Sequence, residues 1–319
     1  GEPMKPLTSN QQYDCVVVGS GASGSIIAAK LAQAGQSVLI LEAGPSRDLK
    51  DLISSQLWAR QLKWSGSAVE EEGNHKIGHG FNAGFGAGGS ALHHYGVWPR
   101  LHNNDFDILS KHGKNLNWPI SYETLRPYYD EVQADVGISG DAKAEIWRPK
   151  GEPYPMPPLP VFAQGQVISK GFSAMGLTTA PIPLAINSVP YKGNPSCVYD
   201  GWCDAGCPIG ALKNPLVTHL KQAILAGTEI RYDAQVTRVL TDKNRQDVAS
   251  GVEYIDRDGH TQRVKAGRVV LAAFTVQTVR ILLNSARANG VALGNQFDNL
   301  GRYLTTHAGR TVFGLFSEQ

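Results

Sequence analysis

A glycine-rich turn between a short apolar run and a helix-like run most constrains how this 319-residue chain can fold. Residues 13–18 form a β-type run that leads into Gly19-Ser20-Gly21-Ala22-Ser23-Gly24, after which apolar residues recur at helical spacing. A second apolar run, 37–41, ends at Glu42. A G-x-G-x-x-G sequence in this strand–helix–strand context is typical of a dinucleotide-binding βαβ unit. The alternative is a glycine turn in some other α/β protein.

Each part of this unit has a physical role in holding a dinucleotide. The first glycine permits the tight turn, Gly21 lets the backbone approach a pyrophosphate at the helix N-terminus, and Gly24 lets helix and strand pack closely. Glu42 is placed to accept hydrogen bonds from ribose hydroxyls. The unit alone does not distinguish FAD from NAD. The contacts predicted here are Gly19, Gly21, Ala22, Ser23, Gly24 and Glu42.

Charge and hydropathy exclude several classes of function. The net charge is +2 and no basic run is present, so nothing indicates nucleic-acid binding. No apolar run approaches the ~18 residues that span a bilayer, and residues 1–12 lack the pattern of a signal peptide. Membrane association is therefore expected only through a partner. A chain without a signal is expected in the cytoplasm unless a partner carries it out.

Two later segments extend the dinucleotide pattern. One is Gly84-Phe85-Gly86-Ala87-Gly88-Gly89-Ser90-Ala91-Leu92-His93-His94. The other, residues 228–273, is rich in strand-type runs, with a hairpin expected near Asp258-Gly259 and an apolar run at its end. Helical spacing follows at residues 278–283. These segments favour FAD over NAD.

Together with residues 117–129 and 299–307, these motifs resemble the glucose–methanol–choline (GMC) oxidoreductases from about Tyr13 to Gly309. The resemblance implies an α/β fold, with a Rossmann-like FAD-binding domain and a partial substrate-domain insertion. The implied FAD-binding domain is discontinuous and covers residues 13–150 and 212–309. Residues 151–196 would begin the substrate side, and the remainder of the substrate domain is expected beyond residue 319.

The same resemblance places further residues beside the FAD. The glycine segment would lie along the flavin, Val236 would meet the adenine, and the end of the apolar run would lie near the pyrophosphate. Phe274-Thr275 departs from the family, which has small residues there. The residues carried over are Gly86, Gly88, Gly89, Ser90, Val236, Ala272 and Ala273.

His93 is the residue of the glycine segment with the most specific predicted role. Some GMC enzymes tether FAD covalently through a histidine a few residues after the double glycine, which is the position of His93. A neutral imidazole nitrogen suits this bond because it can attack the flavin methyl carbon. Covalent attachment through His93 and non-covalent contact remain alternatives, and the neighbouring His94 competes for the role.

Three of the four cysteines fall within one short loop. Cys197, Cys203 and Cys207 are separated by glycine-containing segments and can converge on one centre. Thiolates are soft ligands that suit iron–sulfur chemistry, and a proline follows the third cysteine, as in ferredoxin runs. Zinc with His219 as fourth ligand, one disulfide with a free thiol, and purely structural cysteines are the alternatives. A four-iron cluster with Asp200 or Asp204 is a further variant.

Within the GMC family, this loop is similar to the flavin subunits of bacterial FAD/iron–sulfur dehydrogenases of glucose, fructose, glycosides and polyols. The resemblance implies that the loop 197–211 holds a 3Fe-4S cluster on its three cysteines. It implies a dehydrogenase that oxidises a sugar, glycoside, polyol or sugar-acid hydroxyl by hydride transfer to FAD. Electrons would leave through the cluster to a cytochrome c or quinone.

The resemblance also implies partners and a location. A cytochrome c subunit and a small chaperone-like subunit with the export signal are expected, which places the protein in the periplasm, with the cytoplasm as alternative. No catalytic base is assigned in this chain, because the expected histidine–asparagine or histidine–histidine pair lies beyond residue 319. Two other functions stay open: a GMC oxidase that uses oxygen and has structural cysteines, and a non-catalytic FAD-binding relay or assembly subunit.

Overall fold

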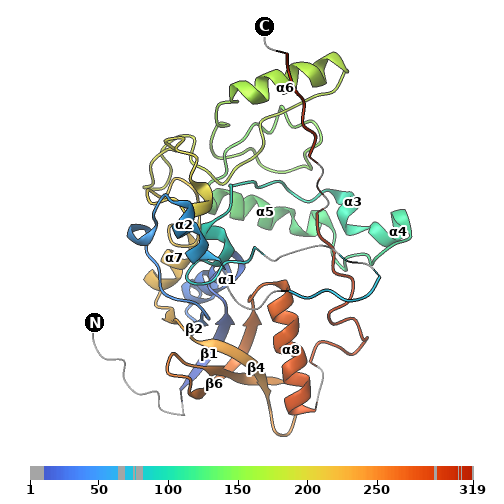
Figure 1. Ribbon diagram of the computed structural model, residues 1–319. Helices are drawn as coiled ribbons and strands as arrows, with labels where there is room; N and C mark the ends of the chain where they lie inside the picture. The colour runs from blue at the N-terminus through green and yellow to red at the C-terminus, as the bar shows by residue number, and fades with distance from the viewer. Residues whose placement is uncertain are drawn as a thin grey trace.

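A six-stranded mixed sheet organises the computed structural model (Figure 1), which describes residues 11–63, 69–74, 76, 82–290, 293–307, 309 and 311–317. The strand order is β3-β2-β1-β6-β5-β4. The first four of these strands are parallel, and the last three form an antiparallel meander. The strands are β1 (Gln12–Val18), β2 (Val38–Leu41), β3 (Glu229–Arg231), β4 (Gln235–Thr241), β5 (Ala249–Ile255) and β6 (Thr261–Leu271).

Strand β6 belongs to both halves of the sheet. Its first part pairs antiparallel with β5, with Val252 opposite Val264, and its second part pairs parallel with β1, with Val16 opposite Val269. The turn between β5 and β6 contains the expected Asp258-Gly259 hairpin. Because β6 runs parallel to β1, the residues that follow these two strands lie at the same edge of the sheet, although they are far apart in sequence.

Alternation along β1 and β2 sends apolar side chains to both faces of the sheet. Cys15 and Val17 pack on one face against the small residues of α1 (Ala22–Gln33) and against α7 (His219–Leu225). Val16 and Val18 pack on the other face with residues of the meander and of α8 (Thr275–Asn289). Burial on both faces is typical of parallel strands in α/β folds. The predicted α/β, Rossmann-like fold class is confirmed.

The remaining helices lie outside this core. They are α2 (Gln56–Ala59), α3 (Asn103–Phe106), α4 (Ile108–His112), α5 (Tyr122–Val136) and α6 (Ala163–Ala174), with 3-10 turns at 49–51, 60–62, 89–92 and 203–205. Helix α5 lies between the sheet and α6 (Figure 1). Among the described residues, no helix has the length and hydropathy needed to cross a membrane. The domain boundaries expected from the sequence stay a prediction.

Candidate functional site

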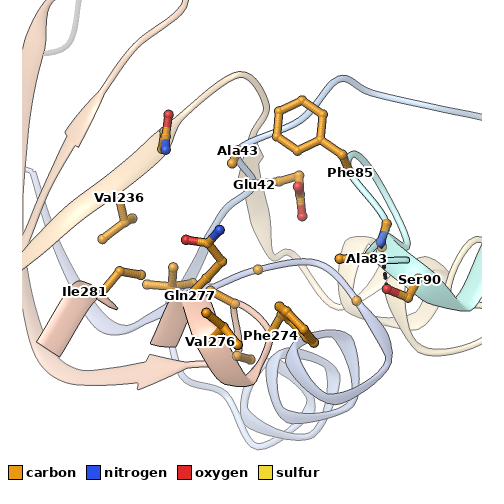
Figure 2. A pocket seen from close by; sticks show the side chains of 18 of the residues that line it. Glu42, Ala43, Ala83, Phe85, Ser90, Val236, Phe274, Val276, Gln277 and Ile281 are labelled. Atoms are coloured by element: carbon orange, nitrogen blue, oxygen red, sulfur yellow. Dashed lines mark hydrogen bonds between the residues drawn. The ribbon is translucent and has the colours of Figure 1, made fainter. Parts of the chain in front are cut away.

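A cavity of about 980 Å³ lies at the carboxyl ends of β1 and β2. Val18 and Leu41, the last residues of these strands, line it together with residues of α1, the second glycine segment, β4 and the start of α8. Figure 2 shows side chains from these elements converging on the space. Ligands of open α/β sheets bind in this position, and the volume is at the upper end for small-molecule sites.

At Gly19 and Gly24, the turn after β1 is packed too tightly for a side chain. Gly19 has a φ of +103°, and a Cβ there would lie 2.4 Å from the Ala272 carbonyl oxygen. A Cβ on Gly24 would lie 2.1 Å from the Gly19 carbonyl oxygen. The first turn of α1 is thereby held against the end of β6. Gly19 and Gly24 therefore permit the tight turn and the close helix–strand packing that the sequence predicted.

Ser20 connects the three segments that the sequence assigned to the dinucleotide. Its hydroxyl donates to Glu42 Oε2 at 2.7 Å and accepts from the Gly88 N–H at 3.3 Å. Its own N–H donates to the same carboxylate oxygen at 3.0 Å, and the Gly44 N–H donates to Glu42 Oε1 at 3.0 Å. Ser20 is fully buried. The network fixes the Glu42 carboxylate at the cavity before any ligand binds.

Ten of the predicted contact residues line the cavity, and four do not. Those that line it are Gly19, Gly21, Ala22, Ser23, Glu42, Gly89, Ser90, Val236, Ala272 and Ala273. Gly24, Gly86, Gly88 and His93 are not part of the lining. Gly86 and Gly88 have φ values of +119° and +84° and shape the turn that presents Gly89 and Ser90. The Ser90 hydroxyl accepts the Gly84 N–H at 2.7 Å, which closes that turn (Figure 2).

Two helix N-termini face the cavity. Ala22 and Ser23 begin α1, and Phe274 and Val276 flank the start of α8; all four line the space. Neither first turn carries an acidic side chain. Free N–H groups and the helix dipole make such termini favourable for anions. The arrangement suits a ligand with a central pyrophosphate.

His93 and His94 differ in what their ring nitrogens contact. Both nitrogens of His94 are occupied, one at 2.8 Å from the Lys213 carbonyl oxygen and the other accepting the Gly96 N–H at 3.1 Å. The Nε2 of His93 is buried without a hydrogen-bond partner. Burial lowers the pKa of His93, so its imidazole is held neutral. Of the two, His93 has the free nitrogen.

The three loop cysteines line one small pocket. Cys197, Cys203 and Cys207 share it with Asp200, and all three are free thiols of intermediate exposure. Burial, together with the charges of the other two cysteines and of Asp200, raises the pKa of Cys203. Burial and the nearby Asp204 raise the pKa of Tyr95, so the loop lies close to the end of the glycine segment. Cys15, the fourth cysteine, is buried in the core beneath α1.

The spacing of the thiols distinguishes between metal centres. Thiolates around one zinc ion lie about 3.8 Å apart, given tetrahedral Zn–S bonds of about 2.3 Å. The three sulfur atoms do not all lie within 4.8 Å of one another, nor do any two of them with a nearby carboxylate or histidine. His219, the proposed zinc ligand, does not line the pocket, and its Nε2 lies 3.4 Å from Asp135. As placed, the thiols do not surround a single zinc ion, and the pocket that they line has a volume of about 40 Å³.

Sequence reasoning missed three polar residues at the cavity. Ser20 occupies a variable position of the fingerprint, and its role appears only when Glu42 and Gly88 are brought to it. Gln277 and Arg280 lie on the first turns of α8 and line the cavity. Helical spacing in this region was recognised, but not which face of the helix would meet the cavity.

Comparison with known proteins decides the family. The family model described as GMC oxidoreductase matches residues 13–308. The chain belongs to the GMC oxidoreductase family. This confirms the resemblance inferred from the glycine segments.

Relatives within the GMC family agree with this assignment. The fructose dehydrogenase large subunit of Gluconobacter japonicus is 30% identical, over 93% of this chain and 58% of the relative. The 2-methyl-1,2-propanediol dehydrogenase of Mycolicibacterium austroafricanum is 32% identical, over 96% of this chain and 57% of the relative. An FAD-dependent oxidoreductase from Chaetomium thermophilum shares the fold, with a TM-score of 0.61 at 19% identity, over 88% of this chain and 50% of the other. The chain thus spans little more than half the length of these GMC relatives.

Proposed function

We propose that this chain is the FAD-binding part of a dehydrogenase that oxidises a hydroxyl of a sugar, glycoside, polyol or sugar acid. The observation that carries the proposal is the cavity in which Ser20 joins the fingerprint turn, Glu42 and the second glycine segment. GMC membership and relatives named as dehydrogenases of fructose and of a diol support the substrate class. FAD, when bound, accepts the hydride from the alcohol carbon.

The residues of this chain would hold the cofactor in a fixed orientation. The N–H groups at the start of α1 would face the pyrophosphate. Three hydrogen bonds hold the Glu42 carboxylate in place, so that it can accept further hydrogen bonds from the ribose hydroxyls. Ser90 and Gly89 line the part of the cavity on the flavin side. The catalytic histidine–asparagine pair expected beyond residue 319 stays a prediction.

The loop 197–211 supports a second part of the proposal, an iron–sulfur cluster on Cys197, Cys203 and Cys207. Three free thiols line one pocket, and as placed they do not form a group of ligands around a single zinc ion. Asp204 of this loop lies close enough to Tyr95 to contribute to its raised pKa, so the loop lies near the end of the glycine segment. A cluster carries electrons one at a time, so it would separate the electron pair that a hydride delivers. We therefore favour a dehydrogenase over an oxidase.

Partners and location follow from the same proposal. One relative is named as the large subunit of a fructose dehydrogenase, which supports a complex of several chains. We propose a cytochrome c or quinone as electron acceptor, a small chaperone-like subunit, and a periplasmic location.

The deciding experiment is the EPR spectrum of the oxidised protein, with iron, zinc and acid-labile sulfide measured on the same sample. We expect a three-iron signal, its loss in Cys203→Ala, and its retention in the matched control Cys15→Ala, which removes a core cysteine outside the loop. Stoichiometric zinc without an iron signal would refute the cluster. A protein that binds no FAD would refute the whole proposal.

An oxidase is the second candidate, because other relatives carry oxidase names. Stopped-flow mixing of the substrate-reduced protein with oxygen separates the two. Rapid peroxide release without an artificial acceptor supports an oxidase with structural cysteines. Slow reoxidation by oxygen and rapid reoxidation by cytochrome c or a quinone supports the dehydrogenase.

A further inference from the structure

Two polar side chains on the first turns of α8 face the cavity. Gln277 and Arg280 are separated by three residues and therefore share a face of the helix. Both line the cavity, as does Ile281 on the adjoining side of that face. Figure 2 shows Gln277 reaching from α8 into the space between Val236 and Glu42.

Neither side chain has a partner among the residues that the structure describes. No hydrogen bond or ion pair engages the Gln277 amide or the Arg280 guanidinium, and Arg280 is exposed. Two arginines of the sheet region are paired: Arg238 binds Glu253 at 3.1 Å, and Arg231 binds Glu229 at 3.1 Å. The two cavity residues thus hold free donors in a lining that is mostly glycine, alanine and apolar side chains, with Ser23, Glu42, Glu71, Ser90 and Gln235 as its other polar members.

The position of these donors indicates which half of the cofactor they meet. In Figure 2, Val236, Ile281 and Gln277 lie on one side of Glu42, and Ala83, Phe85 and Ser90 lie on the other. An acidic residue at the position of Glu42 binds the ribose of the adenosine half. The second glycine segment occupies the opposite, flavin side. The adenine therefore falls on the side of α8 and β4.

We propose that Arg280 and Gln277 bind the adenine of the FAD, a role that rests on the proposed function. A planar guanidinium stacks on an aromatic face and holds it by cation–π attraction. A glutamine amide can pair with the N6 and N7 edge of adenine through one donor and one acceptor. Ile281, packed with Val236 in the core, forms the apolar floor under the ring. Arg280 covers the outer face, and Gln277 reads the edge.

The experiment measures binding of three nucleotides to flavin-free protein by isothermal titration calorimetry. The parent and all variants carry His93→Ala, so that no covalent bond retains the flavin. ADP probes the adenosine half, FMN probes the flavin half, and FAD probes both. Arg280→Ala is compared with Arg287→Ala, which removes an exposed arginine from the same helix outside the cavity.

We expect Arg280→Ala to weaken ADP and FAD binding about 5- to 30-fold and to leave FMN binding unchanged, as cation–π energies of about 1–2 kcal/mol imply. Arg280→Lys restores part of the loss, and Arg287→Ala has no effect. Gln277→Ala lowers the preference for ADP over GDP, because guanine presents a different edge.

The outcomes separate this inference from the proposed function. If the parent binds FAD but Arg280→Ala changes ADP affinity less than about 2-fold, the adenine assignment is wrong and the proposed function stands. Equal losses of ADP and FMN affinity also overturn it, since that pattern means a general distortion. If the parent binds neither FAD nor ADP, the proposed function itself fails.

Discussion

At the scale of single residues, the neighbouring His93 and His94 differ in whether a ring nitrogen is free to bond the flavin, so opposite results are predicted for their substitution. A tethering nitrogen must be neutral and free, and only His93 offers one, because both nitrogens of His94 are hydrogen-bonded. Ala91 lines the cavity, and His93 lies two residues beyond it. We expect acid-precipitated wild-type and His94→Ala protein to keep the yellow colour and His93→Ala to release it. Complete release from the wild type would show that the flavin is held without a covalent bond.

The residue scale also shows why the sequence revealed only part of the site. Gly19 and Gly24 could be predicted, because tight packing leaves no other residue possible and the pattern is local. Ser20 could not, since its partners Glu42 and Gly88 reach it only in the folded chain. The sequence also did not reveal which face of α8 meets the cavity. Phe274, with a φ of +74°, precedes the helix where the family has small residues, so the pattern did not fix which face meets the cavity.

At the scale of elements, Asn187 closes the cysteine loop at both ends. Its N–H donates to the Ala211 carbonyl at 2.9 Å, and its carbonyl accepts the Cys197 N–H at 2.8 Å. The side-chain amide donates to the carbonyls of Asn194 and Pro195 at 3.2 and 3.0 Å. Asn187 is fully buried. One residue thus fixes where the loop leaves and rejoins the fold.

Removing that amide should loosen the loop. We expect Asn187→Ala to lower the free energy of unfolding by about 1–3 kcal/mol, because two part-buried carbonyls lose their donor, and to speed the reaction of the cysteines with a thiol reagent. Asn187→Asp should cost more, since it turns an acceptor toward those carbonyls. Asn194→Ala is the matched control, because that residue acts through its main-chain carbonyl. Equal effects of Asn187→Ala and Asn194→Ala would mean that the Asn187 side-chain amide does not hold the loop in place.

Element boundaries were predictable where packing repeats a simple pattern. The sequence indicated a hairpin near Asp258-Gly259 and an apolar run at 268–273; β6 begins at Thr261, just after that hairpin, and its first half alternates polar and buried residues against β5. Asp130 of helix α5 pairs with the buried Arg100 at 2.5 Å, a contact between distant segments that no local pattern indicates.

At the scale of the whole molecule, two buried histidines, His93 and His219, and the partly buried His94 link stability to pH. Burial lowers the pKa of His93, His94 and His219, although hydrogen bonds to the Lys213 carbonyl and to Asp135 offset part of the effect at the last two. A histidine whose pKa is lower in the folded state favours the neutral form there, so the unfolded chain binds more protons on acidification. Stability is then complete above the ordinary pKa of about 6.5 and falls as the pH drops through the folded values.

Carboxylates produce a separate loss at lower pH. Asp130 and Asp135 have lowered pKa values, because the hydrogen bonds and charges of Arg100, Lys30 and His219 outweigh the effect of burial. Their contribution is complete above the ordinary pKa of about 4 and disappears only below it. Two windows of acid destabilisation are therefore expected, one beginning near pH 6.5 and one below pH 4.

Urea unfolding at a series of pH values tests this directly. We expect the free energy of unfolding to fall between about pH 7 and pH 5, before any carboxylate titrates. His219→Gln should reduce that slope, even if it also lowers stability at pH 7.5, because it removes one of the three groups. His112→Gln, at an exposed position, should leave the slope unchanged. A stability that is constant or rising as the pH falls from 7 to 5 would contradict the buried, neutral state of these histidines and, with it, the neutral nitrogen on which a tether through His93 depends.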